Sequence, residues 1–383
     1  MLYLADHLKK NGHEVEFFGM YDANNTVGNS AGLYTQNMDF HSNGIARFLY
    51  PFKIIYSFEA KSKIMRVIDN FKPDIVHMHN INFQLTPSII YGAKKKKIPI
   101  VETVHDYQMI CPNHLLYNFE KNTPCEKCTG GSYRDCIKQK CIHGSVIKSI
   151  IGAAEAKFYS FLKIYKNIDL FVCPSRFLEN KLLAAREYYN GKTVTIHNFI
   201  DKEKFKSAPR KEEDYIAFVG RLSKEKGIEN IRDAAKLLPE YKFMIAGSGP
   251  DGEILKNIPN VTLKGFLTGD ELFEFVGRAK VLLLPSVCYE NCPLSILEAQ
   301  CMGVPVVTMN KGGMAELVKD GVTGTLVNEP TPEGIARKLR ETVENDAYYQ
   351  SLKNNCEKEK DNIYGVEAYA DILIQAYERL IAR

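Results

Sequence analysis

The chain has 383 residues, of which 45% are hydrophobic and 25% are charged, and its formal net charge is +4 at pH 7. This length is too great for one hydrophobic core, so the composition predicts a globular protein of two domains. No run of 18 apolar residues is present, which argues against a membrane-spanning helix.

The two halves of the chain differ in charge. Residues 1–200 contain 25 Lys and Arg against 17 Asp and Glu, whereas residues 201–383 contain 25 against 29. A basic first half suits an anionic membrane face or an anionic acceptor, and uneven solvation is the alternative explanation. Residues 1–12 follow an amphipathic helical pattern and not that of a secretion signal. We expect a cytoplasmic protein, with possible peripheral contact at the inner membrane face, and no nucleic-acid partner.

Short apolar runs alternate with helical stretches along the whole chain. In the first half, strands are expected at 13–19, 74–79, 98–105, 169–175 and 193–198. In the second half, they are expected at 215–220, 242–248, 261–266, 281–286, 304–309 and 324–327. Most of these runs are apolar on both faces, as strands of a covered parallel sheet are. The alternation predicts an α/β fold with two successive doubly wound, Rossmann-like domains.

A polar, charged stretch at 201–214 marks the junction between the domains. We therefore expect an N-terminal domain at 1–203 and a C-terminal domain at 204–364. A long amphipathic helix at 365–383 is expected to cross back to the N-terminal domain. Ligands of doubly wound sheets bind at the C-terminal ends of the strands, so the cleft between the two domains is the expected site.

Two basic residues follow the first strand of the second half. Arg221 comes directly after the strand at 215–220, and Lys226 lies one turn further on, before the next helix. An Arg and a Lys that converge at this point form an anion clamp suited to a diphosphate. An ordinary solvated basic turn is the alternative.

Two carboxylates flank the start of a short helix in YENCPLSILEAQCMGVPVV, residues 289–307. Pro293 suits the first helical position, so free N–H groups from Asn291 to Leu294 would face the cleft as a seat for phosphate or sugar hydroxyls. Glu290 precedes this turn, and Glu298 lies about two turns inside a helix whose side chains lean toward its N-terminus. Both carboxylates are therefore expected to point at one ligand, such as a ribose or a hexose.

The sequence resembles the retaining glycosyltransferases of family 4, which have the GT-B fold. The resemblance rests first on Glu290-x7-Glu298 within ENCPLSILEAQCMGVPVV. Other similar blocks of the second half are FVGRLSKEKGIE (218–229), MIAGSGP (244–250), LKGFLTGDEL (263–272) and KGGMAELVKDGVTGTLV (311–327). Those of the first half are VHD (104–106), VCPSRF (172–177) and IHNFID (196–201). The resemblance covers nearly the whole chain and implies two Rossmann-like domains that face a cleft.

The resemblance also implies a role for each matching residue. Arg221 and Lys226 would hold the nucleotide diphosphate and stabilise the leaving group. Glu298 would bind the ribose hydroxyls, Glu290 would bind the transferred sugar, and His105 would face the sugar from the N-terminal domain. The remaining donor-binding residues would be Asn291, Cys292, Pro293 and Leu294 at the sugar and phosphate, Leu267 at the base, and Gly247. A buried strand-end histidine is the alternative for His105, and His77 and His79 are interpreted as structural.

The implied activity is retaining transfer of a hexose from a nucleotide-diphosphate sugar to a hydroxyl acceptor. Cationic side chains would meet the negative charge that develops as the diphosphate leaves. No D-x-D triplet occurs in the chain, so we expect metal-independent catalysis without a cofactor. A glycan or a lipid-linked acceptor in bacterial surface-polysaccharide or glycolipid synthesis is expected. A sugar-nucleotide epimerase and a catalytically inactive sugar-nucleotide-binding relative are the alternatives.

A cysteine-rich stretch at 111–143 departs from the simplest pattern of the family. The spacing C-x2-C-x7-C-x4-C predicts a structural zinc site. Its ligands would be Cys125, Cys128, Cys136 and Cys141, with Cys111 as an alternative and His114 and His143 in reserve. Disulfides, which a reducing compartment disfavours, and uncoordinated thiols are the other interpretations. The site would staple an insertion on the acceptor side of the cleft.

The resemblance also bears on the start of the chain. Family members begin with a strand and a glycine-rich loop, and only then reach the helix that residues 1–12 resemble. Here residue 1 already lies inside that helix. We therefore expect an N-terminally truncated version of a longer protein, with weak sugar transfer and a destabilised N-terminal domain.

Overall fold

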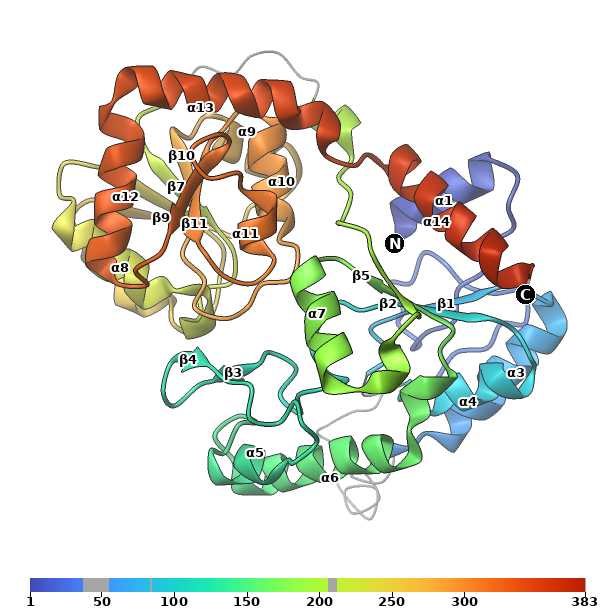
Figure 1. Ribbon diagram of the computed structural model, residues 1–383. Coiled ribbons are helices and arrows are strands. Elements are labelled where there is room, and N and C mark those ends of the chain that lie inside the picture. Colours follow the sequence, from blue (N-terminus) through green and yellow to red (C-terminus); the bar gives the residue numbers. More distant parts are fainter. Residues whose placement is uncertain (37–54, 83–84, 206–211, 383) are drawn as a thin grey trace.

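The computed structural model describes residues 1–36, 55–82, 85–205 and 212–382, which form two lobes (Figure 1). Each lobe is built on a parallel sheet. Within these ranges, the N-terminal sheet contains, in spatial order, β1 (Val76–His79), β2 (Ile100–Thr103), β5 (Leu170–Cys173) and β6 (Thr193–Thr195). The C-terminal sheet contains, in spatial order, β12 (Gly324–Val327), β11 (Val306–Met309), β10 (Val281–Leu284), β7 (Ile216–Val219), β8 (Phe243–Ala246) and β9 (Val261–Gly265). The expected α/β fold is confirmed.

Helices pack around both sheets. Those of the first half are α1 (Leu2–Lys10), α3 (Phe58–Phe71), α4 (Ser88–Lys95), α5 (Arg134–Lys138), α6 (Val146–Leu162) and α7 (Arg176–Ala185). Those of the second half are α8 (Ile228–Leu237), α9 (Gly269–Gly277), α10 (Leu294–Cys301), α11 (Met314–Leu317), α12 (Pro332–Glu344), α13 (Asp346–Glu359) and α14 (Val366–Ile381). Ser57 and Ser175 cap α3 and α7, because each hydroxyl accepts a hydrogen bond from a free N–H of the first turn. In the described chain, no helix is both long and apolar enough to span a bilayer.

Strands that read as continuous apolar runs are the ones covered on both faces. All four residues of β10 and all four of β11 are buried, and so are all four of β2. Parallel strands are buried in this way because their crossover helices lie on both sides of the sheet.

The last helix of the chain packs on the N-terminal sheet. Tyr369 and Leu373 of α14 are buried in one cluster with Val101 of β2 and Val172 of β5. Figure 1 shows α14, in red, beside α1, in blue, and Leu4 of α1 belongs to the same cluster. The two ends of the described chain therefore meet on one face of the first sheet.

The strand expected at 13–19 is not formed, so that prediction is wrong. The N–H of Phe17 donates a hydrogen bond to the carbonyl of Gly28 at 2.8 Å. The N–H of Thr35 donates a hydrogen bond to the carbonyl of Gly19 at 3.0 Å. Backbone groups need hydrogen-bond partners, and here the partners come from the loop that follows. In the described residues, β1 is consequently an edge of the sheet.

Sequence patterns also missed a small hairpin in the cysteine-rich insertion. Its strands are β3 (Tyr117–Asn118) and β4 (Thr123–Pro124), which pair in antiparallel fashion. With only two residues in each strand, they carry no periodic pattern that a sequence can reveal.

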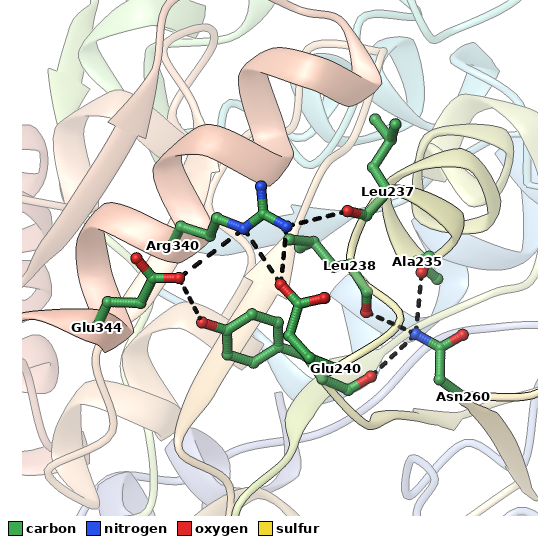
Figure 2. Close-up of polar contacts among 8 residues, drawn as sticks. Ala235, Leu237, Leu238, Glu240, Asn260, Arg340 and Glu344 are labelled. Atoms are coloured by element: carbon green, nitrogen blue, oxygen red, sulfur yellow. Dashed lines mark hydrogen bonds and ion pairs between the residues drawn. The ribbon is translucent and has the colours of Figure 1, made fainter.

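Side chains close the C-terminal end of α8 and hold it near α12 (Figure 2). The side-chain nitrogen of Asn260 lies 2.8–2.9 Å from three carbonyl oxygens, those of Ala235, Leu238 and Tyr241. Arg340 of α12 pairs with Glu240 at 2.8 Å and donates to the carbonyl of Leu237 at 3.2 Å. The last carbonyls of α8, which have no partner within the helix, are thereby satisfied.

Replacing Asn260 is expected to destabilise the protein without touching the cleft. Asn260→Ala leaves carbonyls at the end of α8 without a donor, and we expect a loss of about 1–3 kcal/mol in the free energy of unfolding. Urea denaturation measures this loss. Asn354→Ala, at an exposed position of α13, is the control and should change the free energy by less than about 0.5 kcal/mol. Equal stabilities of the two variants would contradict this account.

A buried acid in β2 makes stability depend on pH. The side chain of Glu102 is buried, and its Oε2 has no hydrogen-bond partner among the described residues. Burial, with a further contribution from the charge of Asp106, raises the pKa of Glu102 to about 8. Between an unfolded pKa of about 4.5 and that value, the folded state binds the extra proton, so stability falls as the pH rises.

Glu102→Gln is therefore expected to stabilise the protein at pH 8 and not at pH 4.5. The neutral amide has no charge to bury, and a difference of one in pKa corresponds to about 1.4 kcal/mol, so the gain at pH 8 is on the order of a few kcal/mol. Thermal unfolding at both pH values measures it. Glu120→Gln removes an exposed carboxylate and should show no such pH-dependent difference. A Glu102→Gln effect that is the same at both pH values would refute the assignment.

Candidate active site

A cavity of about 360 Å³ lies between the two domains, and both contribute to its wall. The N-terminal half supplies His105, Asp106, Tyr107, His114, Leu115, Pro174 and Asn198. The C-terminal half supplies Arg221, Glu225, Lys226 and the loop 288–293. These residues follow the carboxyl ends of β2, β5, β6, β7 and β10, where ligands of doubly wound sheets bind.

A lysine and a glutamate that stand 64 residues apart in sequence meet in this cavity. Nζ of Lys226 lies 2.5 Å from Oε1 of Glu290, and the hydroxyl of Ser286 donates to the same oxygen at 2.8 Å. Burial lowers the pKa of Lys226, but the charge and hydrogen bond of Glu290 outweigh this effect and the pKa is raised. Lys226 therefore stays positively charged next to the carboxylate of Glu290.

The turn that carries Lys226 is tied to the loop that carries Glu290. The carbonyl of Glu225 accepts hydrogen bonds from the N–H groups of Val287 and Cys288, at 2.9 and 3.2 Å. Gly227 makes this approach possible, because a Cβ there would lie 2.0 Å from the carbonyl oxygen of Pro285 and its φ is +80°. Since β7 and β10 are neighbours in the sheet, the two loops emerge side by side.

Arg221 lines the same cavity and is exposed. It adds a second positive charge beside Lys226, while the lining also contains three acidic residues, Asp106, Glu225 and Glu290. Two cationic side chains on one wall of the cavity can donate hydrogen bonds to an anionic ligand.

The helix after Glu290 begins at Leu294, and Pro293 is its cap residue and not its first helical residue. The prediction for Pro293 was therefore wrong by one position. The side chain of Asn291 forms its hydrogen bonds with the N-terminal half. Its side-chain nitrogen donates to the carbonyl of Val104 at 3.0 Å, and its side-chain oxygen accepts from Ser175 at 2.7 Å. Asn291 thus joins the two domains beside the cavity.

Cys292 makes a similar connection. Its carbonyl accepts a hydrogen bond from the side chain of Asn198 at 2.9 Å, and its sulfur lies 3.3 Å from the N–H of Asn198. Burial raises the pKa of the Cys292 thiol to about 12, so the thiol stays protonated. Cys292 thus holds the loop in place and is not a thiolate nucleophile.

Four of the residues expected to bind the donor do not line this cavity: Glu298, Leu294, Gly247 and Leu267. Burial raises the pKa of Glu298, and the charge of Lys204 opposes the rise. Leu267 packs against the C-terminal core. Gly247 lies where β7 and β8 end, and a Cβ there would come within 1.9 Å of the carbonyl oxygen of Gly220, which explains the glycine by packing.

His105 faces the cavity from the N-terminal half, and two further histidines lie beside it. Its Nε2 lies 3.0 Å from Nδ1 of His79, and the rings of His79 and His77 lie 4.3 Å apart. Burial lowers the pKa of His105, although the charge of the Asp106 carboxylate opposes this. Burial lowers the pKa of His77 to about 3. Neutral imidazoles are therefore expected at pH 7.

Sequence reasoning gave no role to several residues that line or support the cavity. Asp106 lies 3.5 Å from the ring of His114 and 3.2 Å from the side chain of Asn82. The ring of Tyr289 packs against that of Phe177 of α7 at an angle of 48°, with ring centroids 4.7 Å apart. Asp106 directly follows the strand predicted at 98–105, and Asn198 is the last residue of the strand predicted at 193–198, so the strand-end rule could have found them. The contact of Tyr289 with the N-terminal domain could not be predicted, because it depends on how the two domains pack together.

Known proteins resemble this chain in sequence and in fold. The sequence matches the protein family Glycosyltransferase Family 4 over residues 1–204 and the protein family Glycosyl transferases group 1 over residues 199–359. An uncharacterised glycosyltransferase of Methanocaldococcus jannaschii is 25% identical, over 98% of this chain and 92% of that protein. The structure of sucrose-phosphate synthase from Thermosynechococcus elongatus superimposes with a TM-score of 0.70 at 18% identity, covering 99% of this chain and 92% of that one.

The Anabaena protein HepE, crystallised with UDP and glucose, superimposes with a TM-score of 0.63 at 17% identity, covering 91% of this chain and 86% of that one. Both solved structures have the GT-B fold, with two Rossmann-like domains, as the sequence predicted here. The family match spans more than half of the chain, and the matched relatives are glycosyltransferases. The chain therefore belongs to Glycosyltransferase Family 4 and is a glycosyltransferase.

Proposed function

We propose that this glycosyltransferase moves a hexose from a nucleotide-diphosphate sugar to a hydroxyl group of a glycan or lipid-linked acceptor, with retention of configuration and without a catalytic metal. The observation that carries the proposal is the contact between Lys226 and Glu290, beside Arg221, in the cavity between the domains. This arrangement places positive charge and a hydroxyl-binding carboxylate within reach of one ligand.

In the proposed reaction, the bond between the anomeric carbon of the sugar and the diphosphate oxygen breaks. Lys226 and Arg221 would donate hydrogen bonds to the leaving diphosphate, whose negative charge grows in the transition state. Glu290 would accept hydrogen bonds from the sugar hydroxyls while keeping Lys226 charged. The acceptor hydroxyl would attack from the face that the leaving group occupies, and its proton would pass to an oxygen of the departing diphosphate as the new glycosidic bond forms.

Three further groups of residues have proposed positions around this reaction. His105 would hydrogen-bond to the sugar from the N-terminal side of the cavity. The loop from Asn291 to Leu294, which joins the domains, would seat the sugar and the phosphate. The nucleoside would lie beyond the cavity, and it would be bound there by Glu298, Leu267 and Gly247.

The family and the neighbours support a nucleotide-sugar donor. HepE is solved with UDP and with UDP-glucose, and its fold is that of this chain. Metal-independence is supported by the two cations at the cavity and by the sequence, which has no D-x-D triplet. The basic first half favours an anionic, lipid-linked acceptor in surface-polysaccharide or glycolipid synthesis. Contact with the membrane face and a cytoplasmic location stay predictions.

Ligand binding tests the proposed donor site. We expect one member of a panel of UDP-, GDP- and ADP-sugars to bind to the purified chain in ligand-observed NMR, and the free diphosphate of the same nucleotide to compete with it. Arg221→Ala should weaken the binding, and Arg379→Ala, in the C-terminal helix and away from the cavity, should not. If no nucleotide sugar binds, or if Arg221→Ala binds as well as the parent chain, the proposed site is wrong.

A further inference from the structure

Five cysteines from different parts of the insertion line one enclosed cavity of about 10 Å³. They are Cys111, Cys125, Cys128, Cys136 and Cys141, and we name them the thiol cluster. They make up half of the ten cysteines in the chain. A cavity of this size holds about one water-sized sphere, so it suits a single ion and no larger ligand.

The insertion has little regular structure to maintain its shape. Its elements are β3 and β4, of two residues each, and α5, of five residues. Its own buried core joins only Cys128, Tyr133 and Cys136 to Ala153 of α6. Five residues other than glycine have a left-handed backbone, namely His114, Leu116, Asn122, Lys140 and His143, and such conformations persist only where the surrounding structure holds them. A segment with so small a core is usually stabilised by a cross-link or a metal ion.

The thiols lie close together around this cavity. The side chains of Cys136 and Cys141 share a hydrogen bond. Thiols gathered in this way can bind one cation as thiolates, because the metal ion compensates the charge that remains when their protons leave.

We propose that the thiol cluster binds one structural zinc ion through four of its sulfurs. Cys128, Cys136 and Cys141 are the common ligands, and either Cys111 or Cys125 supplies the fourth. Each bound thiol releases its proton to solvent, and four thiolates with Zn²⁺ make the closed tetrahedral site that structural zinc prefers. This inference is independent of the proposed catalytic function.

Binding requires a local movement. As the side chains stand, no group of three or more His, Cys, Asp or Glu residues in the described chain is arranged to hold a metal ion. The sulfurs must therefore rotate onto the ion as they lose their protons. Cys111 now donates to the side chain of Asn113 at 3.0 Å, and Cys125 lies 4.0 Å from that of Gln139. Whichever of Cys111 and Cys125 gives up its present side-chain contact to bind the metal is the fourth ligand.

Such an ion would hold one wall of the active-site cavity. Leu115 and His114 of the insertion line that cavity. The side chain of Asn122 donates to Glu229 of α8 at 3.0 Å, so the insertion also touches the C-terminal domain. Figure 1 shows β3 and β4 reaching toward that domain, away from the N-terminal sheet. A metal at the thiol cluster would hold the insertion in the position from which Asn122 makes this contact.

Elemental analysis tests the proposal directly. Chain purified under reducing conditions, without added metal or chelator, is expected to contain about one zinc per molecule. Cys136→Ser should lose the zinc, whereas Cys301→Ser, a half-buried cysteine of α10 outside the cluster, should retain it. Cys111→Ser and Cys125→Ser should differ, because only one of them removes a ligand. Removal of the zinc by a chelator should lower the melting temperature, and added zinc should restore it.

A second measurement covers the case in which Cys136→Ser fails to fold. Cobalt(II) exchanged into the parent chain should give the intense thiolate-to-metal absorption of a tetrahedral tetrathiolate site. The proposal is overturned if the parent chain contains no zinc and takes up neither zinc nor cobalt under reducing conditions. It is equally overturned if intact-mass analysis finds Cys136 and Cys141 joined as a disulfide in the active protein.

Discussion

Lys226→Ala is expected to lower the turnover number by roughly 100-fold or more while the protein stays folded. Stabilising a developing negative charge in a site shielded from water usually supplies a few kcal/mol, and Lys226 is the cation that Glu290 holds in the cavity at 2.5 Å. The loss should fall on kcat, because the interaction strengthens as the diphosphate leaves. Steady-state kinetics with the donor identified in the binding panel measures it.

Lys224→Ala is the matched control for this variant. Lys224 lies two residues earlier in the same turn, does not line the cavity, and is 3.8 Å from Glu229 with about half of its side chain exposed. Its removal should leave turnover within about threefold of the parent chain, because exposed ion pairs contribute little. Near-normal turnover in Lys226→Ala would remove this lysine from the mechanism.

Glu290→Gln is expected to have the second largest effect. The substitution keeps the size of the side chain but removes the charge that faces Lys226 at 2.5 Å and Ser286 at 2.8 Å. A neutral amide orients Lys226 less firmly and accepts weaker hydrogen bonds from sugar hydroxyls. We expect turnover to fall by roughly 10- to 100-fold, with thermal stability nearly unchanged.

Glu271→Gln, at an exposed position of α9, is the control for the glutamate and should behave as the parent chain does. Comparison of Glu290→Gln with the double variant Lys226→Ala, Glu290→Gln adds a sharper check. If the two residues act as a unit, the double variant is little worse than Lys226→Ala alone. Strictly multiplicative losses would show that the contact between them has no part in catalysis.

The fold class was predictable because buried strands have a simple signature. Runs such as VLLL in β10 and VVTM in β11 are apolar at nearly every position and buried at all of them, as expected for a sheet covered on both faces. The run at 13–19 has polar residues at alternate positions, and its backbone found partners in the following loop. Periodicity reports which face a residue prefers but not which segment will pair with it.

The positions of single site residues were only partly predictable. The strand-end rule brought Arg221, Lys226 and Glu290 into one cavity with His105, although it could not give the direct contact of Lys226 with Glu290. That contact depends on β7 and β10 being neighbours, which spacing along the chain does not encode. In the same way, Asn291 has an inter-domain partner that only the packing of the two domains reveals.

The measurement that tests the central claim most directly is product analysis of the sugar-nucleotide reaction in buffer without added divalent metal. NMR of the reaction should show release of the nucleotide diphosphate and a sugar whose new bond keeps the anomeric configuration of the donor. Added magnesium should not change the rate, because in the proposed mechanism Arg221 and Lys226 balance the negative charge of the leaving group. A sugar nucleotide that is epimerised without diphosphate release, a product of inverted configuration, or a reaction that starts only when magnesium is added would contradict the account.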